Sequence, residues 1–318
     1  MDIRPLDLAT RPIVDAYIRQ YPPQVSELTF TNLFVWRRSR PVFFAEVDGS
    51  LVFLVYGKNS RGPNVVFGHS LGEVLPARIV KALDIGVQGF VRIPESTAAS
   101  LLDAGFQVEE DRDNADYVYR VQDLAELEGR RFHKKRNLVK QCLETYTCTY
   151  EPITPELVSE CLAMQERWCQ ARDCGHDPGL CSEFIAIEES FIHWQSLGLV
   201  GGAILIDGNI EAFALGETLR PGTAVCHFEK AMPDYQGLGQ LINQWFAKYT
   251  LKGFEFENRE QDLGLPGLRQ AKKSYHPDHM VDKYIAWIPS SGPHTLSIVE
   301  PHECAKHGAD KERTEDLS

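Results

Sequence analysis

Two glycines one residue apart, Gly237 and Gly239, could form a turn that binds a phosphate group. Glycine adopts backbone angles that other residues avoid, so successive N–H groups can turn toward a bound anion. Apolar residues then recur at intervals of three and four, which predicts an amphipathic helix whose positive end faces the turn. A purely structural turn is the alternative. The predicted phosphate-binding residues are Ala231, Met232, Gln236, Gly237, Leu238, Gly239 and Gln240.

Glu229 and Lys230 lie near the end of the apolar stretch that leads into this turn. Side chains alternate along a strand, so one of the two should point toward a bound ligand. A carboxylate in this position can remove a proton from a bound ligand, and we expect Glu229 to be such a general base, directly or through a water. A solvated or ion-paired carboxylate is the alternative.

Polar side chains follow the next predicted strand at its carboxyl end, where open sheets place their ligand-binding groups. We expect Asn258 to take part in catalysis and Asp262 to bind substrate. Arg269 and Lys272 are three residues apart and so share one helix face, which could hold donor phosphates or an acceptor carboxylate. An ordinary loop and a solvated helix face are the alternatives.

The strongest basic run in this acidic chain is RRFHKKRN, at residues 130–137. Guanidinium and ammonium groups both bind phosphate, so one interpretation is a site for a coenzyme or for the acceptor end of a tRNA. A solvated helix face is the other interpretation. Few aromatic residues are interspersed, which does not support sequence-specific RNA recognition. The predicted substrate-binding residues here are Lys134, Lys135, Arg136 and Asn137.

Composition argues against several classes of protein. The formal net charge is −12, which argues against coating DNA or an anionic membrane by overall charge. The chain has neither a signal-peptide pattern nor an apolar run of about 18 residues, so we expect no membrane span and a cytoplasmic location. The cysteines and histidine from Cys161 to Cys181 lack the paired spacing of a zinc site, so we expect no metal.

The elements that would position these groups occur twice along the chain. Each half shows a strand, two helices, three antiparallel strands, a helix, a strand, a helix and a strand. Two halves with one element order indicate a structural duplication. In the first half, residues 67–76 read FGHSLGEVLP where the turn should be and lack the paired glycines, so we expect no donor site there.

This order, with a Gly-x-Gly turn between the fourth strand and the third helix, resembles the GNAT acyltransferase fold. A more specific match lies in residues 257–264, ENREQDLG, and residues 267–277, GLRQAKKSYHP. These segments are similar to the tandem-GNAT family related to the C-terminal domain of phosphatidylglycerol lysyltransferase. The run HKKRN at 133–137 resembles a Lys-Arg-Asn segment of the same family, so the resemblance extends over nearly the whole chain to residue 289.

The resemblance implies an α/β (α+β) fold of two tandem GNAT-like domains, each a mixed, mostly antiparallel sheet flanked by helices. The expected parts are an N-terminal domain at 1–123, a basic linker helix at 124–146, a donor-binding domain at 147–289 and a polar, disordered tail at 290–318.

The implied reaction is transfer of an acyl or aminoacyl group to an amine on a small molecule or peptide. The donor substrate is acyl-CoA or aminoacyl-tRNA, which makes tRNA a candidate partner, and no cofactor is bound permanently. The resemblance also implies that Tyr275 protonates the leaving group, with packing as the alternative role. A non-catalytic ligand-binding or regulatory module on the same fold is the alternative function.

Overall fold

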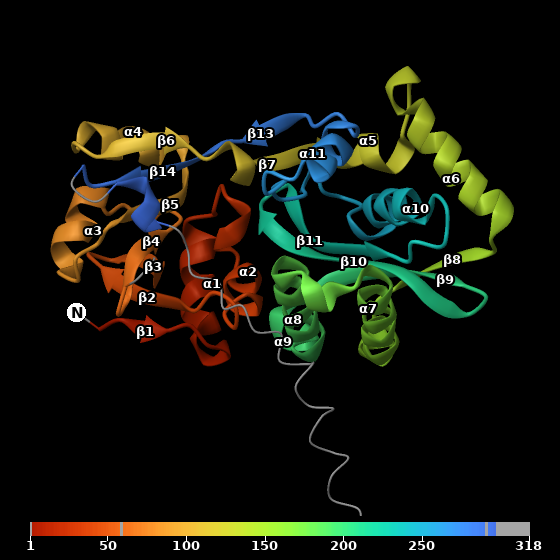
Figure 1. Ribbon diagram of the computed structural model, residues 1–318, viewed down its shortest axis with the longest axis horizontal. Coiled ribbons are helices and arrows are strands. Elements are labelled where there is room, and N and C mark those ends of the chain that lie inside the picture. Colours follow the sequence, from red (N-terminus) through yellow and green to blue (C-terminus); the bar gives the residue numbers. More distant parts are fainter. Residues whose placement is uncertain (1, 58–59, 290–291, 297–318) are drawn as a thin grey trace, which may run out of the picture.

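The computed structural model describes residues 2–57, 60–289 and 292–296. They form two α/β units side by side, each built on one seven-stranded sheet (Figure 1). The strand orders are β1-β2-β3-β4-β5-β14-β6 and β13-β7-β12-β11-β10-β9-β8. β4 runs parallel to β5 and β11 parallel to β12, while the other described pairs are antiparallel. The predicted class of two mixed, mostly antiparallel sheets with flanking helices is confirmed.

The first sheet contains a hairpin at Asp48 and Gly49, whose positive φ angles of 48° and 76° suit a tight two-residue turn. Its strands are β1 (Arg4–Pro5), β2 (Val42–Val47), β3 (Ser50–Tyr56), β4 (Pro63–Phe67), β5 (Gly89–Pro94), β6 (Gln107–Glu110) and β14 (Lys283–Trp287). Its helices are α1 (Arg11–Gln20), α2 (Phe30–Val35), α3 (Pro76–Leu83) and α4 (Glu95–Asp103).

The second sheet carries helices on both faces, because alternate side chains of β10 enter different cores. Phe213 and Leu215 pack with α7 and α8, whereas Ala212 and Ala214 pack with α10. The strands are β7 (Asp116–Arg120), β8 (Cys148–Pro152), β9 (Val200–Ile206), β10 (Asn209–Arg220), β11 (Thr223–Ala231), β12 (Phe256–Asn258) and β13 (His279–Val281). The helices are α5 (Val121–Glu126), α6 (His133–Thr145), α7 (Val158–Arg172), α8 (Pro178–Ile192), α9 (Trp194–Leu197), α10 (Leu238–Trp245) and α11 (Pro266–Lys273).

Two strands cross between the units. β7 ends the first half of the chain but pairs with β12 and β13, and β14 ends the second half but pairs with β5 and β6. The predicted domain boundaries at 123 and 147 therefore do not coincide with those of the sheets. Periodicity indicates that a segment is a strand, but it does not specify the neighbour with which that strand pairs.

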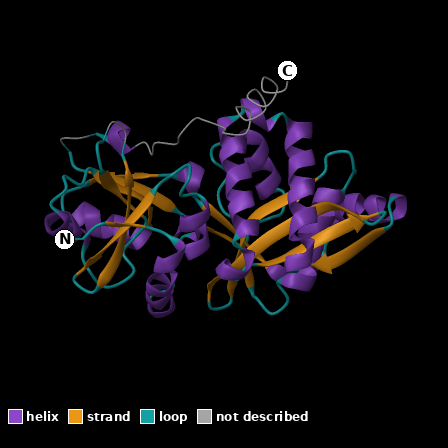
Figure 2. Cartoon of the chain, turned by 90° about the horizontal axis from the view of Figure 1, so that it is seen from below, coloured by secondary structure: helices purple, strands orange, loops and turns teal. Residues whose placement is uncertain are grey.

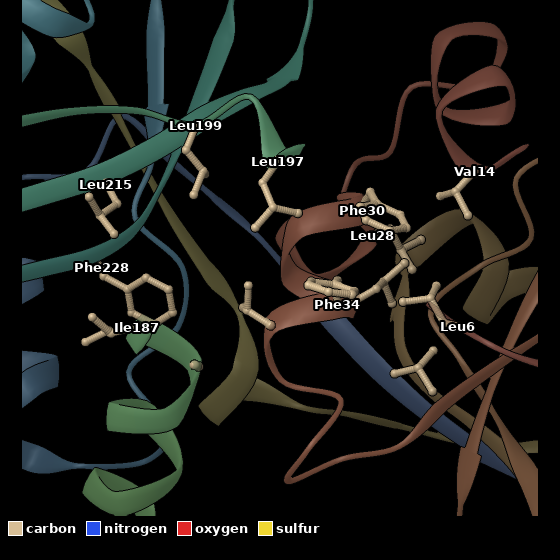
Figure 3. Packing of buried hydrophobic residues seen from close by; sticks show 14 of the residues in the cluster. Leu6, Val14, Leu28, Phe30, Phe34, Ile187, Leu197, Leu199, Leu215 and Phe228 are labelled. Atoms are coloured by element: carbon tan, nitrogen blue, oxygen red, sulfur yellow. The ribbon is translucent and has the colours of Figure 1, made fainter. Parts of the chain in front are cut away.

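The two units share one hydrophobic core. Leu28 and Phe34 of the first unit belong to the same buried cluster as Ile187, Leu199 and Phe228 of the second (Figure 3). Seen from below, helices lie on either side of the strands in both units (Figure 2). Because packed interiors resist deformation, a continuous core fixes the two sheets relative to each other.

Most of the predicted tail at 290–318 lies outside the described residues. Within it, Pro293–Leu296 form a short 3-10 helix, and Leu296 is buried in the shared core, so the expectation of disorder fails at this point. Among the described residues, every helix is too short or too polar to cross a lipid bilayer.

Candidate active site

The site forms where β11 and β12 separate. The two strands pair from Thr223 and Phe256 as far as Val225 and Asn258. Beyond that point, β11 continues beside β10 with a shift in register opposite Leu215. Such a bulge redirects the side chains that follow it, and bulges are frequent beside active sites. The second half of β11 is thereby free to face side chains from α6, α10 and the segments around α11.

Arg259 lies at the centre of this opening, directly after β12. Its Nη2 is 2.8 Å from Oε2 of Glu229, and its Nε is 3.7 Å from Oε1 of Glu257. The Asn243 amide of α10 lies 3.3 Å from the same Glu229 oxygen. Burial alone would lower the pKa of Arg259, but Glu229 and Glu257 outweigh it and hold that pKa well above its usual value. Arg259 is therefore a permanent positive charge.

Tyr275 lies between two cations. The Lys135 ammonium is 4.0 Å from the centroid of its ring, and the Arg259 guanidinium is 5.8 Å from it. Burial raises the pKa of the Tyr275 phenol above its usual value, so the ring carries a proton at neutral pH. Burial also lowers the pKa of Lys135, an effect that Arg259 reinforces and Glu229 opposes. The fold thus brings together Lys135, Glu229 and Tyr275, three residues that the sequence predicted separately.

Asn258 is directed away from this group, because neighbouring residues of a strand point to opposite faces. Its amide nitrogen donates to Oδ2 of Asp116 over 3.0 Å, and its oxygen accepts from the N–H of Glu260 over 2.8 Å. Asp116 in turn accepts from Lys283 over 2.6 Å. Asn258 therefore belongs to a buried network between the two units, and the structure does not bring it to Glu229 or Tyr275.

Asp262 and Arg269 bind each other. The guanidinium of Arg269 donates to both oxygens of Asp262 at 2.8 Å, and the Tyr117 hydroxyl donates to Asp262 at 2.6 Å. Burial would raise the pKa of Asp262, but these hydrogen bonds outweigh it and hold that pKa well below its usual range. The pair fixes the loop that follows β12.

Lys272 holds the same loop from α11. Its ammonium donates to the backbone carbonyl of Arg259 and lies 3.5 Å from that of Glu260. Burial lowers the pKa of Lys272 to about 8. Its contacts fix the backbone that carries the Arg259 side chain, so in this structure Lys272 positions a residue of the site.

The predicted phosphate-binding turn lies beneath α6. Gly237 has a φ of 85° and caps α10, and a Cβ there would collide with the carbonyl oxygen of Leu138 in α6. Gly239 has more room, because a Cβ would lie 4.0 Å from that of Ala231. The backbone also bonds internally: Leu238 donates to Tyr235, Gln240 to Gly237, and Met232 to Glu211, while the Gln236 side chain is exposed.

The side chains of the basic run at 130–137 make different contacts. Arg136 donates to the backbone carbonyls of Leu127 and Gly129, the second over 2.7 Å, and so fixes the start of α6. Asn137 lies 3.4 Å from the ring of His133, and Lys134 is exposed. Of the predicted residues here, Lys135 is the one that contacts the site.

Arg259, Glu257 and Asn243 received no individual role from the sequence. The signal was present for two of them. In FEFENR, residues 257 and 259 are charged and two apart, and therefore on one face of the predicted strand. Among the described residues, no group of three or more His, Cys, Asp or Glu side chains could hold a metal ion.

Comparison with known proteins places this geometry in a family. The family model described as phosphatidylglycerol lysyltransferase, C-terminal, matches residues 18–287. The chain belongs to this family. The phosphatidylglycerol lysyltransferase C-terminal match includes every described strand except β1, together with α6, and with them Lys135, Glu229, Arg259 and Tyr275.

Solved structures agree with this assignment. A conserved protein of unknown function from Bacteroides thetaiotaomicron is 30% identical, over 91% of this chain and 99% of that one, with a TM-score of 0.83. The C-terminal domain of a putative lysylphosphatidylglycerol synthetase from Agrobacterium fabrum is 16% identical, over 90% and 93%, with a TM-score of 0.64. The protein L-PGS from Bacillus licheniformis is 14% identical, over 91% and 97%, with a TM-score of 0.63. No curated protein sequence matches the chain.

These likenesses support a fold of two tandem GNAT-like units, as the sequence predicted. Within the phosphatidylglycerol lysyltransferase family, the chain is thereby related to aminoacyl transferases of this fold.

Proposed function

We propose that this chain transfers an aminoacyl group from an aminoacyl-tRNA to an amine acceptor. The observation that supports this most is the position of α6, which covers the turn at Gly237 and directs Lys135 onto Tyr275. Family membership adds support, since the relatives named above include a putative lysylphosphatidylglycerol synthetase.

The position of α6 favours tRNA over acyl-CoA as the donor. A coenzyme pyrophosphate would need the N–H groups of the turn before α10, and the backbone of α6 packs against that turn. The same helix begins with basic side chains, of which Lys134 is exposed, and phosphates of an RNA end bind such groups. Helix α6 thus obstructs the binding of acyl-CoA and offers contacts to tRNA.

The site residues suit aminoacyl transfer in distinct roles. Arg259 stabilises the negative charge that develops on the ester carbonyl oxygen when the amine attacks. Glu229 takes the proton that the attacking nitrogen loses. The new N–C bond forms, the bond from the carbonyl carbon to the ribose oxygen breaks, and the Tyr275 hydroxyl gives its proton to that oxygen.

Lys135 links the helix to this chemistry. Its charge lies over the Tyr275 ring, where it stabilises a phenolate that forms after proton transfer. It also faces the opening from α6, where it can contact the terminal phosphate of the donor. Donor binding and leaving-group departure therefore depend on one side chain.

A thermal-shift comparison tests the donor. A ligand that binds the native state alone raises the melting temperature, so charged tRNA should raise it while acetyl-CoA and longer acyl-CoAs should not. An increase with an acyl-CoA and none with a panel of charged tRNAs would overturn the proposal. Binding of charged tRNA without any transfer to amines would favour the non-catalytic module instead.

A further inference from the structure

Glu257 is a buried carboxylate whose two oxygens lack hydrogen-bond partners among the described residues. It is 1% exposed and lies on β12 beneath Arg259. Buried polar groups in native proteins nearly always have partners, so such a side chain calls for an explanation. A charged, unpaired carboxylate at this depth would destabilise the fold far more than one on the surface does.

Titratable side chains from several elements surround Glu257, but none of them lies at hydrogen-bond distance from it. The nearest cation is Arg259, whose Nε is 3.7 Å away, beyond the usual limit for a hydrogen bond. The other titratable groups that act on it, or on its partner Glu229, are Tyr119 of β7, Lys135 of α6, Tyr150 of β8, Cys226 of β11, Lys272 of α11 and Tyr275 after α11.

Arg259 cannot fully compensate both carboxylates. Its Nη2 is engaged by Glu229 at 2.8 Å, so Glu257 is left with the weaker contact to Nε. Two carboxylates beside one guanidinium carry one negative charge in excess. Because one guanidinium serves both carboxylates, one of them retains a proton at a pH where an isolated carboxylate would have lost it.

We propose that Glu257 is a positioning residue of the site, which shares Arg259 with Glu229 and retains a proton while Glu229 occupies the guanidinium. At rest, the proton resides on Glu257, and Glu229 pairs with Arg259. When Glu257 loses its proton to solvent, Glu229 gains a negative neighbour and binds the proton of the attacking amine more strongly. This role rests on the proposed function of Glu229 as the base.

Electrostatics agree with this arrangement. Burial raises the pKa of Glu257 to about 7, with Arg259 opposing and Glu229 adding to the rise. Because the Glu229 charge adds to the rise, removing it should lower the pKa of Glu257.

Carboxyl carbon NMR of protein labelled at glutamate tests the coupling without any substrate. The wild-type protein should show a glutamate signal that titrates near pH 7 and that is absent in Glu257→Gln. In Glu229→Gln, where Arg259 is free to pair with Glu257, the signal should move down by roughly one pH unit or more. Glu255→Gln is the matched control, since Glu255 lies two residues away, is 62% exposed and pairs with Arg120.

The absence of a near-neutral glutamate signal in the wild-type protein would overturn the proposal. So would an unchanged midpoint in Glu229→Gln, a measurement that keeps Glu257 in place and so does not depend on whether Glu257→Gln folds. If the coupling is found but no charged tRNA is turned over, the proposed function fails while the retained proton stands.

Activity provides a further readout that a purely structural role would not affect. The rate of transfer should rise with pH through about 7 in the wild-type protein, and Glu257→Gln should lose this rise. An unchanged pH profile in Glu257→Gln would contradict the positioning role.

Discussion

Lys135 of α6 holds its ammonium nitrogen 4.0 Å from the ring centroid of Tyr275, which lies directly after α11. The two residues are 140 positions apart in the chain and belong to segments that the sequence assigned to a linker and to a domain. Their contact makes the basic helix α6 one wall of the site, beside β11 and β12.

Replacing Lys135 with Met should weaken transfer while the fold persists. A partly buried cation over an aromatic ring contributes about 1–2 kcal/mol, so we expect a loss of roughly tenfold in kcat/KM for the charged tRNA. Lys252→Met removes the same charge from an exposed position outside the site and should leave the rate unchanged. Equal rates for Lys135→Met and the wild-type protein would contradict the role of α6 in the site.

Tyr275→Phe isolates the hydroxyl group. The ring still packs under Lys135, so the melting temperature should change little. Loss of a general acid typically lowers kcat by about 10²–10⁴-fold. Steady-state kinetics with charged tRNA measures this, and an unchanged kcat would leave Tyr275 with the packing role alone.

Arg259→Lys keeps a positive charge but removes the planar group that faces two carboxylates. Lysine cannot engage both Glu229 and Glu257 with one rigid fork, and a lost donor at a developing oxyanion costs about 10²–10³-fold in kcat. We expect kcat to fall with little change in KM. A fall in affinity alone, with kcat intact, would argue that Arg259 binds the donor instead of stabilising the transition state.

Several residues of this candidate site could be predicted from the sequence, but the signal differed from one residue to the next. Strand alternation predicted that Glu229 or Lys230 faces the site, and the family resemblance indicated Tyr275; the structure places Glu229 and Tyr275 beside Arg259. Periodicity also predicted α10, whose Leu238, Leu241 and Ile242 are buried as expected. The sequence did not distinguish Asn258 from Glu257, because it contains no information about which face of β12 meets α10.

Other misses arise from contacts between distant segments. The contact that requires glycine at position 237 was not visible, because it comes from Leu138, about 100 positions earlier. β6 and β13 were not expected, since Gln107–Glu110 and His279–Val281 have no buried residue that would produce a hydrophobic alternation. The exchange of β7 and β14 likewise depends on pairing that local pattern does not encode.

Gly237 and Gly239 allow a matched test of that packing. Gly237→Ala should destabilise the protein by at least about 1–2 kcal/mol, because alanine is strained at positive φ, and its Cβ would also meet α6. Gly239→Ala lies in the first turn of α10 with room for a methyl group and should be neutral or mildly stabilising. Urea unfolding compares the two, and equal stabilities would contradict the close approach of α6.

Glu257→Gln should change how stability depends on pH. The pKa of Glu257 is raised from 4.5 to about 7 in the folded chain, so the folded state holds this proton more tightly than the unfolded state does. The contribution of Glu257 to the free energy of unfolding therefore falls as the pH rises from about 4.5 to 7. Above pH 7 it is constant. The difference is about 3 kcal/mol by linkage. Urea unfolding at pH 5 and pH 8 should show a greater loss of stability in the wild-type protein than in Glu257→Gln, and parallel losses would contradict the buried charge.

The most direct test of the central claim is transfer of a radiolabelled aminoacyl group from tRNA to amine acceptors, measured beside transfer of a labelled acetyl group from acetyl-CoA. We predict label in amide products from one or more charged tRNAs, lost in Tyr275→Phe and Arg259→Lys, and none from acetyl-CoA. Products from acetyl-CoA alone, or equal yields with the two variants, would contradict an aminoacyl transferase built on α6, β11 and β12.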